Sequence, residues 1–204
     1  MVRDIEQIHG RLPGRLAMRP DETLDGFIFR LGLHNEIRNL SAFRKMLGVY
    51  GQAPYDESDV AAAAYTLGIT SSELSKSASW RCKEPARKGW RQWFGTELPE
   101  KLFRTGHRRF TRSVGGLGYF PAAWSLAPVS YCPITFEEVW SACPSCGSSL
   151  TWTLAHELDE CPKCNTEFSD HDANVLSESH RSGYAAALQL IDPRVGVRVS
   201  ALQE

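Results

Sequence analysis

Two pairs of closely spaced cysteines constrain the fold of this chain more than any other feature. Two residues separate Cys143 from Cys146, two separate Cys161 from Cys164, and fourteen lie between the pairs. Each Cys-x-x-Cys turn directs two thiolates toward one point, so two such turns supply the four ligands of a tetrahedral zinc ion. We therefore predict one structural zinc ion bound by Cys143, Cys146, Cys161 and Cys164.

The residues around these pairs fit a small β zinc ribbon. Gly147 and Asn165 directly follow the turns and tolerate a left-handed backbone conformation, and Leu150, Trp152 and Leu154 alternate as in a strand. Four sulfur ligands leave no open coordination position, which makes such a site structural and not catalytic. The alternative is a pair of redox dithiols, which favours a Cys-x-x-Cys at the start of a helix beside a parallel sheet. The surrounding sequence does not provide that context.

The N-terminal half predicts helices, with Asp21 and Ser41 as N-caps of the first two. Apolar residues recur at helical spacing around 24–31, 42–47, 56–67 and 71–79. Gly68 separates the last two, as in a helix-turn-helix. Lys76 is the one basic residue in the second helix of this unit. We therefore interpret the unit as a structural helical hairpin, with reading of the DNA major groove as the alternative.

Charge is unevenly distributed along the chain. Residues 81–112 carry ten Lys or Arg against three Asp or Glu, whereas 133–180 carry one against nine. Aromatic residues are interleaved with the cations of the basic segment, a combination that suits phosphates and unpaired bases. The predicted nucleic-acid contacts are Arg87, Lys88, Arg91, Arg104, Arg108, Arg109 and Arg112. An acidic protein partner and a solvated helix face remain the alternatives for this segment.

The expected fold class is mainly α with a small β zinc ribbon, and no internal repeat is apparent. The predicted parts are an irregular arm (1–20), a helical helix-turn-helix-like domain (21–80), a basic aromatic-rich connector (81–112), a zinc-binding domain (113–170) and a tail with a short helix (171–204). The sequence contains neither an apolar leader at its start nor an apolar run of about 18 residues, so we expect a cytoplasmic protein.

Two regions of the chain resemble the TniQ (TnsD-like) family of transposition target-selection proteins, which includes short forms in CRISPR-associated transposons. The first reads Arg19-Pro20-x-Glu22-Thr23-Leu24-x-x-Phe27-Ile28-x-Arg30-Leu31. The second comprises Trp124, Tyr131-Cys132 and the two cysteine pairs, in the order and spacing of the family's zinc-binding half. The likeness extends over residues 11 to 168.

The resemblance also identifies a departure from the family pattern. Family members often carry a further zinc finger, and the matching ligand positions here hold Val114, Leu117, Cys132 and Thr135. Only Cys132 remains of the four ligands. We therefore expect a small apolar cluster without metal at these positions, with Cys132 a buried thiol, and one zinc ion in the whole chain.

The resemblance implies a non-catalytic adaptor that links target recognition, by DNA or by a guide-RNA CRISPR effector, to an AAA+ ATPase regulator (TnsC-like) that recruits the transposase. Contacts to that regulator are expected at Arg30, Arg44 and Lys45. The sequence contains no Walker motif and no nucleophile beside a base, so we expect no enzyme activity.

Two other functions remain open. One is a stand-alone transcriptional regulator that uses the helix-turn-helix and the basic segment. The other is an enzyme centred on His107, His156 or His171, although a histidine without an oriented partner is usually an ordinary surface or core residue.

Overall fold

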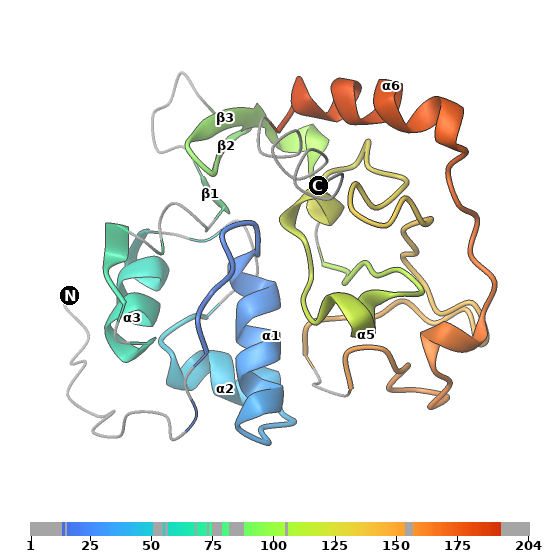
Figure 1. The fold of residues 1–204 in the computed structure, drawn as a ribbon. Coiled ribbons are helices and arrows are strands. Elements are labelled where there is room, and N and C mark those ends of the chain that lie inside the picture. The colour runs from blue at the N-terminus through green and yellow to red at the C-terminus, as the bar shows by residue number, and fades with distance from the viewer. Residues whose placement is uncertain are drawn as a thin grey trace. The chain divides into compact units, whose positions relative to one another are not determined.

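The computed structural model divides into two compact units, residues 1–100 with 152–155 and residues 101–151 with 156–204. It describes residues 14, 16–50, 55, 57–67, 69–72, 74, 79–81, 88–104, 106–153 and 157–192. The basic segment that we expected to form a connector is divided between the units, because the chain passes from one to the other after Glu100. Figure 1 labels the elements of both units.

Unit 1 begins with three helices, α1 (Leu24–His34), α2 (Leu40–Met46) and α3 (Glu57–Leu67). The apolar face expected for α1 is buried, including Phe27 and Ile28. The caps lie two residues from the predicted ones: Thr23 accepts an N–H from Gly26, and Asn39 accepts one from Ala42. The predicted and the observed caps are all residue types that commonly cap helices. Capping propensity alone therefore does not decide at which residue each helix begins.

The predicted helix-turn-helix is described only in part. α3 ends at Leu67, residues 68, 73 and 75–78 are not described, and Leu74 is buried. The structural hairpin and its DNA-reading alternative therefore both stay predictions.

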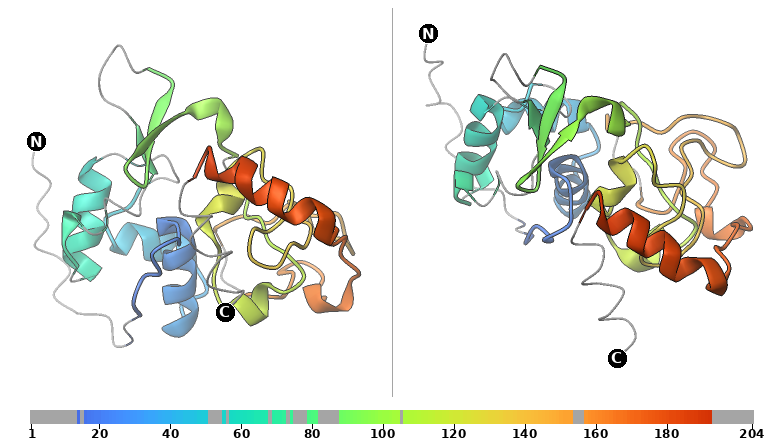
Figure 2. Two further views of the ribbon diagram at one scale, coloured as in Figure 1. Left: turned by 45° about the horizontal axis from the view of Figure 1, so that its top comes forward. Right: turned by 90° about the horizontal axis from the view of Figure 1, so that it is seen from above.

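A three-stranded antiparallel sheet completes the C-terminal part of unit 1, in a segment for which no strand was predicted. Its strands are β1 (Ser79–Arg81), β2 (Trp90–Trp93) and β3 (Thr96–Pro99), in the order β1-β2-β3. Trp93 pairs with Thr96, so Phe94 and Gly95 form a two-residue turn with φ of 47° and 85°. Two positive φ values in succession are typical of the hairpin turn that matches strand twist. Figure 2 shows the hairpin from two sides.

Unit 1 also contains residues 152–155 from far along the chain, of which Trp152 and Thr153 are described. The Trp152 ring packs edge-on against Phe29 of α1, with 6.0 Å between ring centroids, and the amide of Leu40 donates to the carbonyl of Thr153 over 3.1 Å. The described residues 149–153 form no strand, so this part of the predicted zinc ribbon is not found.

Unit 2 is built from turns, isolated β-bridges and short helices. Its helices are η2 (Glu100–Leu102), α5 (Val114–Leu117), η3 (Ala122–Ser125), η4 (Phe168–Asp170) and α6 (Glu178–Gln189), of which Glu100 itself belongs to unit 1. The rings of Phe110 and Phe168 stack at 3.9 Å in its core. The short helix predicted in the tail is found as α6. No helix among the described residues has the length and apolar character to cross a bilayer.

Candidate metal centre

Three turns of unit 2 share one backbone geometry, and each begins with Cys-Pro. They start at Cys132, Cys143 and Cys161. In each, the cysteine carbonyl accepts the N–H of the residue four positions later, over 2.8, 2.8 and 2.9 Å. Each cysteine N–H in turn donates to the carbonyl five positions later, over 2.7, 2.9 and 3.1 Å. The chain is therefore folded back in the same way three times.

The residues flanking these turns are matched as well. Isolated antiparallel bridges join Tyr131 to Glu138, Ala142 to Ser149, and Glu160 to Glu167, with the same separation in each case. The fifth residue of each turn has a positive φ: Phe136 at 58°, Gly147 at 70° and Asn165 at 57°. The repeated Cys-Pro in the sequence was the signal for this repeat. It was missed because the first turn has Thr135 where the others have a second cysteine.

Four thiols of the second and third turns form one cluster. The sulfur atoms of Cys143, Cys146, Cys161 and Cys164 all lie within 4.8 Å of one another. The Sγ atoms of Cys143 and Cys164 are 3.7 Å apart, and those of Cys146 and Cys161 are 3.8 Å apart. A tetrahedral zinc ion about 2.3 Å from each sulfur requires sulfur–sulfur distances of about 3.8 Å. The cluster therefore has the dimensions of a metal site, and the four cysteines could bind a metal ion.

The second and third turns each contribute one buried and one exposed thiol to the cluster. Cys143 and Cys161 are buried, whereas Cys146 and Cys164 are exposed. Burial raises the pKa of Cys143 to about 12. Hydrogen bonding to the side chain and backbone of Ser148 lowers the pKa of Cys146 to about 6. The buried thiol must therefore lose a proton when a metal binds at neutral pH, because a thiolate and not a thiol is the ligand.

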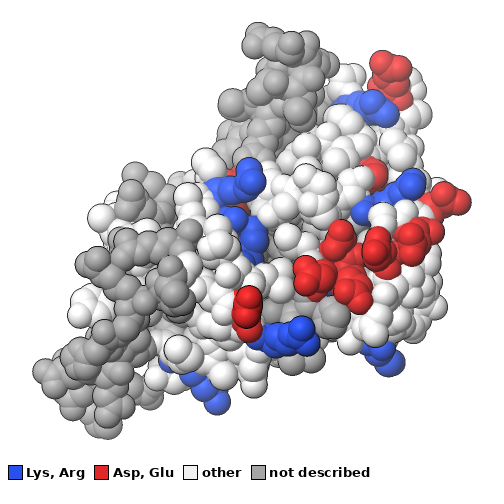
Figure 3. Space-filling model, turned by 60° about the horizontal axis from the view of Figure 1, so that its bottom comes forward, with Lys and Arg blue, Asp and Glu red and all other residues white. Residues whose placement is uncertain are grey.

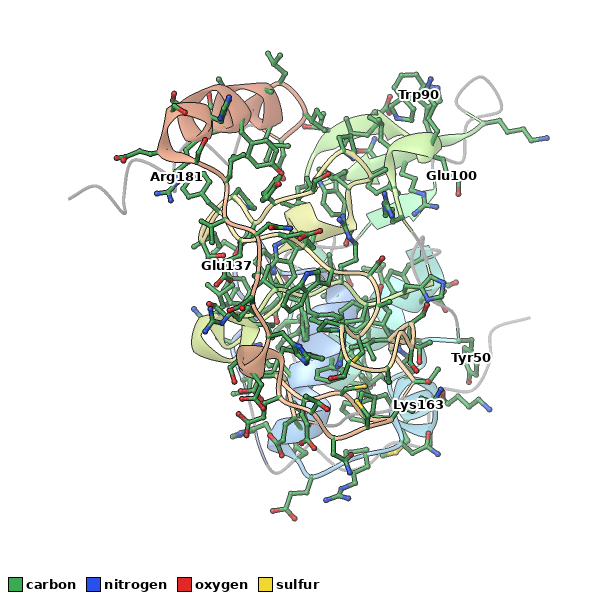
Figure 4. The ribbon with its side chains drawn as sticks, turned by 90° about the vertical axis from the view of Figure 1, so that its right-hand side faces the viewer. Tyr50, Trp90, Glu100, Glu137, Lys163 and Arg181 are labelled. Atoms are coloured by element: carbon green, nitrogen blue, oxygen red, sulfur yellow. The ribbon has the colours of Figure 1, made fainter. Side chains whose placement is uncertain are left out.

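A hydroxyl supports each exposed thiol from the same relative position. Ser148 Oγ lies 3.3 Å from the Sγ of Cys146, and Thr166 Oγ1 lies 3.3 Å from the Sγ of Cys164. Both hydroxyls stand two residues after the cysteine. When the thiol is ionised the hydroxyl donates to it, and such outer hydrogen bonds orient metal ligands. Lys163 projects from the third turn and marks this region in Figure 4.

The remaining Cys-Pro turn has the same backbone but a different set of polar groups. Thr135 occupies the place of the second cysteine, and its Oγ1 donates to Glu137 Oε2 over 3.2 Å. The order of acceptor and donor is thus reversed relative to the other two turns: a hydroxyl stands where the thiolate would be, and a carboxylate stands where the hydroxyl would be. The Cys132 sulfur accepts the N–H of Ile134 over 3.4 Å and is fully buried, which raises the pKa of Cys132.

Glu137 also bonds to Ser113, which directly precedes Val114, one of the positions where we expected an apolar cluster in place of a zinc finger. Its Oε1 accepts the Ser113 hydroxyl over 2.6 Å, and its Oε2 accepts the Ser113 N–H over 3.1 Å. Ser113 directly precedes Val114, whose carbonyl accepts the N–H of Gly118 at the end of α5 over 3.0 Å. Gly118 has a φ of 69°. A carboxylate therefore joins Ser113 to the turn at Cys132; Figure 4 labels Glu137. Of the positions where we expected an apolar cluster, Val114 and Cys132 are buried, and Leu117 and Thr135 are half-buried.

Comparison with known proteins does not place the chain in a family. No family model matches it, and no curated protein matches it.

The seven basic residues predicted to contact nucleic acid do not form one surface. Arg87 lies outside the described residues, and Lys88, Arg104 and Arg112 are exposed. Arg91 is buried and pairs with Glu100 over 2.6 Å. Arg108 and Arg109 are also buried.

The buried arginines have internal roles. The Arg109 guanidinium donates to the carbonyls of Trp124 and Leu126, over 2.8 and 3.1 Å, and to that of Val129. We therefore remove Arg91, Arg108 and Arg109 from the predicted contact set, because a side chain inside the core does not reach a phosphate.

The three predicted contacts to an AAA+ partner also differ in exposure. Arg30 forms a two-point ion pair with the buried Glu22, over 2.8 and 2.7 Å. Arg44 is buried and bonds to Asp25 and Tyr55. Lys45 is exposed. Arg44 is thus part of an internal network and not of the surface, and Lys45 remains as an accessible contact.

Acidic side chains accumulate on unit 2 close to the third turn. Those of segment 157–172 are exposed or half-buried, namely Glu157, Asp159, Glu160, Glu167, Asp170 and Asp172. Figure 3 shows Asp and Glu side chains gathered on the face viewed there.

Of the histidines considered for catalysis, His107 is exposed, His156 is not described, and His171 Nε2 lies 2.9 Å from Ser145 Oγ.

Proposed function

We propose that the four-cysteine cluster binds one structural zinc ion and that the chain is a non-catalytic adaptor of the TniQ type. In this role it links a target-recognition device to an AAA+ transposition regulator. The choice of zinc follows from the ligands, since four thiolates in a tetrahedral cluster are typical of structural zinc. A site closed by four protein ligands stabilises a fold and leaves no position for substrate.

One observation supports the family assignment beyond the sequence motifs. The positions that the resemblance matches to a lost zinc finger retain the turn geometry of a finger. Phe136 occupies the left-handed fifth position of the turn, where Gly147 and Asn165 stand in the other turns. A bulky residue with positive φ is strained and persists only where its surroundings hold it.

Two contacts hold Phe136 in that conformation. Its carbonyl accepts the N–H of Leu176 over 2.8 Å, and the Arg181 guanidinium lies over its ring at 5.0 Å. The turn is thus what a family finger would leave behind after losing three ligands.

The proposed partner surface is revised by the burial of Arg44. On α2 and just after it, Lys45 is exposed together with Met46 at 50% and Tyr50 at 64%. Exposed apolar side chains beside a cation are a composition often found at protein interfaces. We therefore place the contact to the AAA+ regulator at Lys45, Met46 and Tyr50; Figure 4 labels Tyr50.

The test is binding between the purified full chain and an AAA+ ATPase encoded beside it, with and without a non-hydrolysable ATP analogue. We expect tighter binding to the nucleotide-loaded regulator, because an adaptor influences an ATPase by preferring one of its states. The Lys45→Glu variant should bind more weakly while melting at the parent temperature. Binding of DNA alone, with no association to the ATPase in either state, would overturn the adaptor and favour a transcriptional regulator.

A further inference from the structure

The segment 108–110 runs between the chain leaving the second turn and the chain leaving the third. The N–H of Arg108 donates to the carbonyl of Leu150, four residues after Cys146, over 2.8 Å. Phe110 pairs through its backbone with Trp140 and stacks on Phe168, which follows the third turn. The fold therefore holds this segment beside the chain stretches that leave the two cysteine turns, with the side chain of Arg108 buried.

Arg108 is a buried cation at that place. Its exposed fraction is 0%, and its guanidinium lies over the Phe120 ring at 5.4 Å from the centroid. Burial lowers the pKa of Arg108 to about 10, and the attraction that opposes this effect comes from Cys161. The guanidinium is therefore still charged at neutral pH, close to a buried thiol of the metal cluster.

A nearby cation would offset the negative charge of a metal centre with four thiolate ligands. Four thiolates and one divalent ion carry a net charge of −2, and two of the thiolates, those of Cys143 and Cys161, are buried. An uncompensated charge in a protein interior is costly, and buried charges are normally paired. Attraction between the guanidinium and the thiolates therefore stabilises both charges.

We propose that Arg108 is the counter-charge of the four-cysteine metal centre and that it strengthens metal retention from the buried side. The proposal rests on the metal site described above and does not depend on the adaptor function. It also gives Arg108 a role that its place in a basic segment of the sequence did not indicate.

Arg109 provides a matched control next to it. Arg109 is also buried, and burial lowers the pKa of Arg109 to about 10 as well. Its guanidinium, however, donates to backbone carbonyls of Trp124, Leu126 and Val129. The two residues are thus neighbours in the sequence, and both are buried arginines. They differ in the groups that their guanidinium groups face.

The test compares Arg108→Gln, Arg108→Lys and Arg109→Gln in the full chain loaded with zinc. The readouts are the rate of zinc transfer to a chromogenic chelator and the thiolate-to-cobalt charge-transfer band after cobalt substitution. We expect Arg108→Gln to lose zinc about tenfold faster or more, in line with outer-shell effects on metal affinity, and Arg108→Lys to recover most of the loss. Arg109→Gln should release zinc at the parent rate even if it melts lower.

Equal release rates and equal cobalt spectra for Arg108→Gln and the parent overturn the proposal, as does an equal acceleration in Arg109→Gln. If Arg108→Gln does not fold, the cobalt spectrum of Arg108→Lys decides. A different cation beside the sulfur should shift the charge-transfer band, and an unchanged band contradicts the proposal. A parent protein that holds no metal would instead refute the zinc site itself.

Discussion

Three turns of unit 2 share one backbone geometry but differ in the side chains that stabilise them. Two of them begin at Cys143 and Cys161, and the other begins at Cys132. In the first two, the fourth residue is a cysteine and a hydroxyl two residues later supports its sulfur. In the other, the fourth residue is Thr135 and the residue two positions later is Glu137. Hydrogen bonds to the Glu137 carboxylate thus link this turn to Ser113. The comparison shows that one turn geometry accommodates two different sets of side chains.

The largest expected difference between the two regions follows removal of one sulfur. Cys161→Ser should abolish zinc binding and the cooperative melting of unit 2, because metal binding by such sites contributes on the order of 10 kcal/mol. Cys132→Ser should keep one zinc per chain and lose only about 1–3 kcal/mol, the usual cost of a polar group in a buried apolar place. Metal analysis and thermal unfolding of both variants measure this. Loss of zinc from Cys132→Ser would break the comparison.

Acidification should also separate the two regions. The pKa of Cys143 without metal is about 12, so this thiol is protonated at neutral pH and the metal must displace its proton. Zinc affinity therefore falls as the pH is lowered, since protons compete for the same sulfur. A chelator competition from pH 8 to pH 5 should show steadily faster release. Chelation at constant pH should leave the links of Glu137 to Ser113 and Thr135 intact, which hydrogen exchange at the Ser113 amide would report.

Replacement of Glu137 tests the carboxylate link directly. A glutamine offers one acceptor oxygen to three donors, namely the Ser113 N–H, the Ser113 hydroxyl and the Thr135 hydroxyl. Glu137→Gln should therefore cost about 1–3 kcal/mol in the free energy of unfolding, with zinc content unchanged. Glu138→Gln is the control, because Glu138 has a single exposed bond to Asn174, and it should cost less than about 1 kcal/mol. Denaturant titrations that rank the two variants in the opposite order would exclude the link.

The smallest effect is expected at the fifth position of the turn. Phe136→Asn supplies the residue type found at Asn165, and asparagine tolerates the φ of 58° better than phenylalanine does. Relief of backbone strain should offset the lost contact with Arg181, leaving the free energy of unfolding within about 1 kcal/mol of the parent. A loss well above that value would show that the ring, and not the backbone, holds this turn.

The cluster of metal ligands could be predicted from the sequence because its signal is local. Two residues separate each pair of cysteines, and the turn itself brings the thiols together. The turn that begins at Cys132 was not predicted, because a pattern search for cysteine pairs does not detect Cys132 followed by Thr135, although all three turns begin with Cys-Pro. The β2–β3 hairpin escaped for a similar reason, since Phe94 replaces the Asn or Asp usual before the glycine of such turns.

The fate of the arginines could not be predicted, because their partners are remote in sequence. Arg44 bonds to Asp25 and Tyr55, which lie on either side of it along the chain, and Arg109 is held by carbonyls at 124, 126 and 129. A sum of charges over a stretch of sequence treats such buried residues as if they were surface cations. Only the fold shows which of them are enclosed.

Because Trp152 and Thr153 pack into unit 1, this unit cannot complete its fold as soon as residues 1–100 have been synthesised. Phe29 and Leu40 are made early, but the ring and the carbonyl that they contact are more than a hundred residues away along the chain. A nascent chain that has emerged only as far as Glu100 therefore has an unfinished core, with an apolar face of α1 lacking its cover. Closing so long a loop is slow, because its entropy must be lost before the contact forms. The N-terminal unit is thus the first to be synthesised, but its core can be completed only after Trp152 and Thr153 have also emerged.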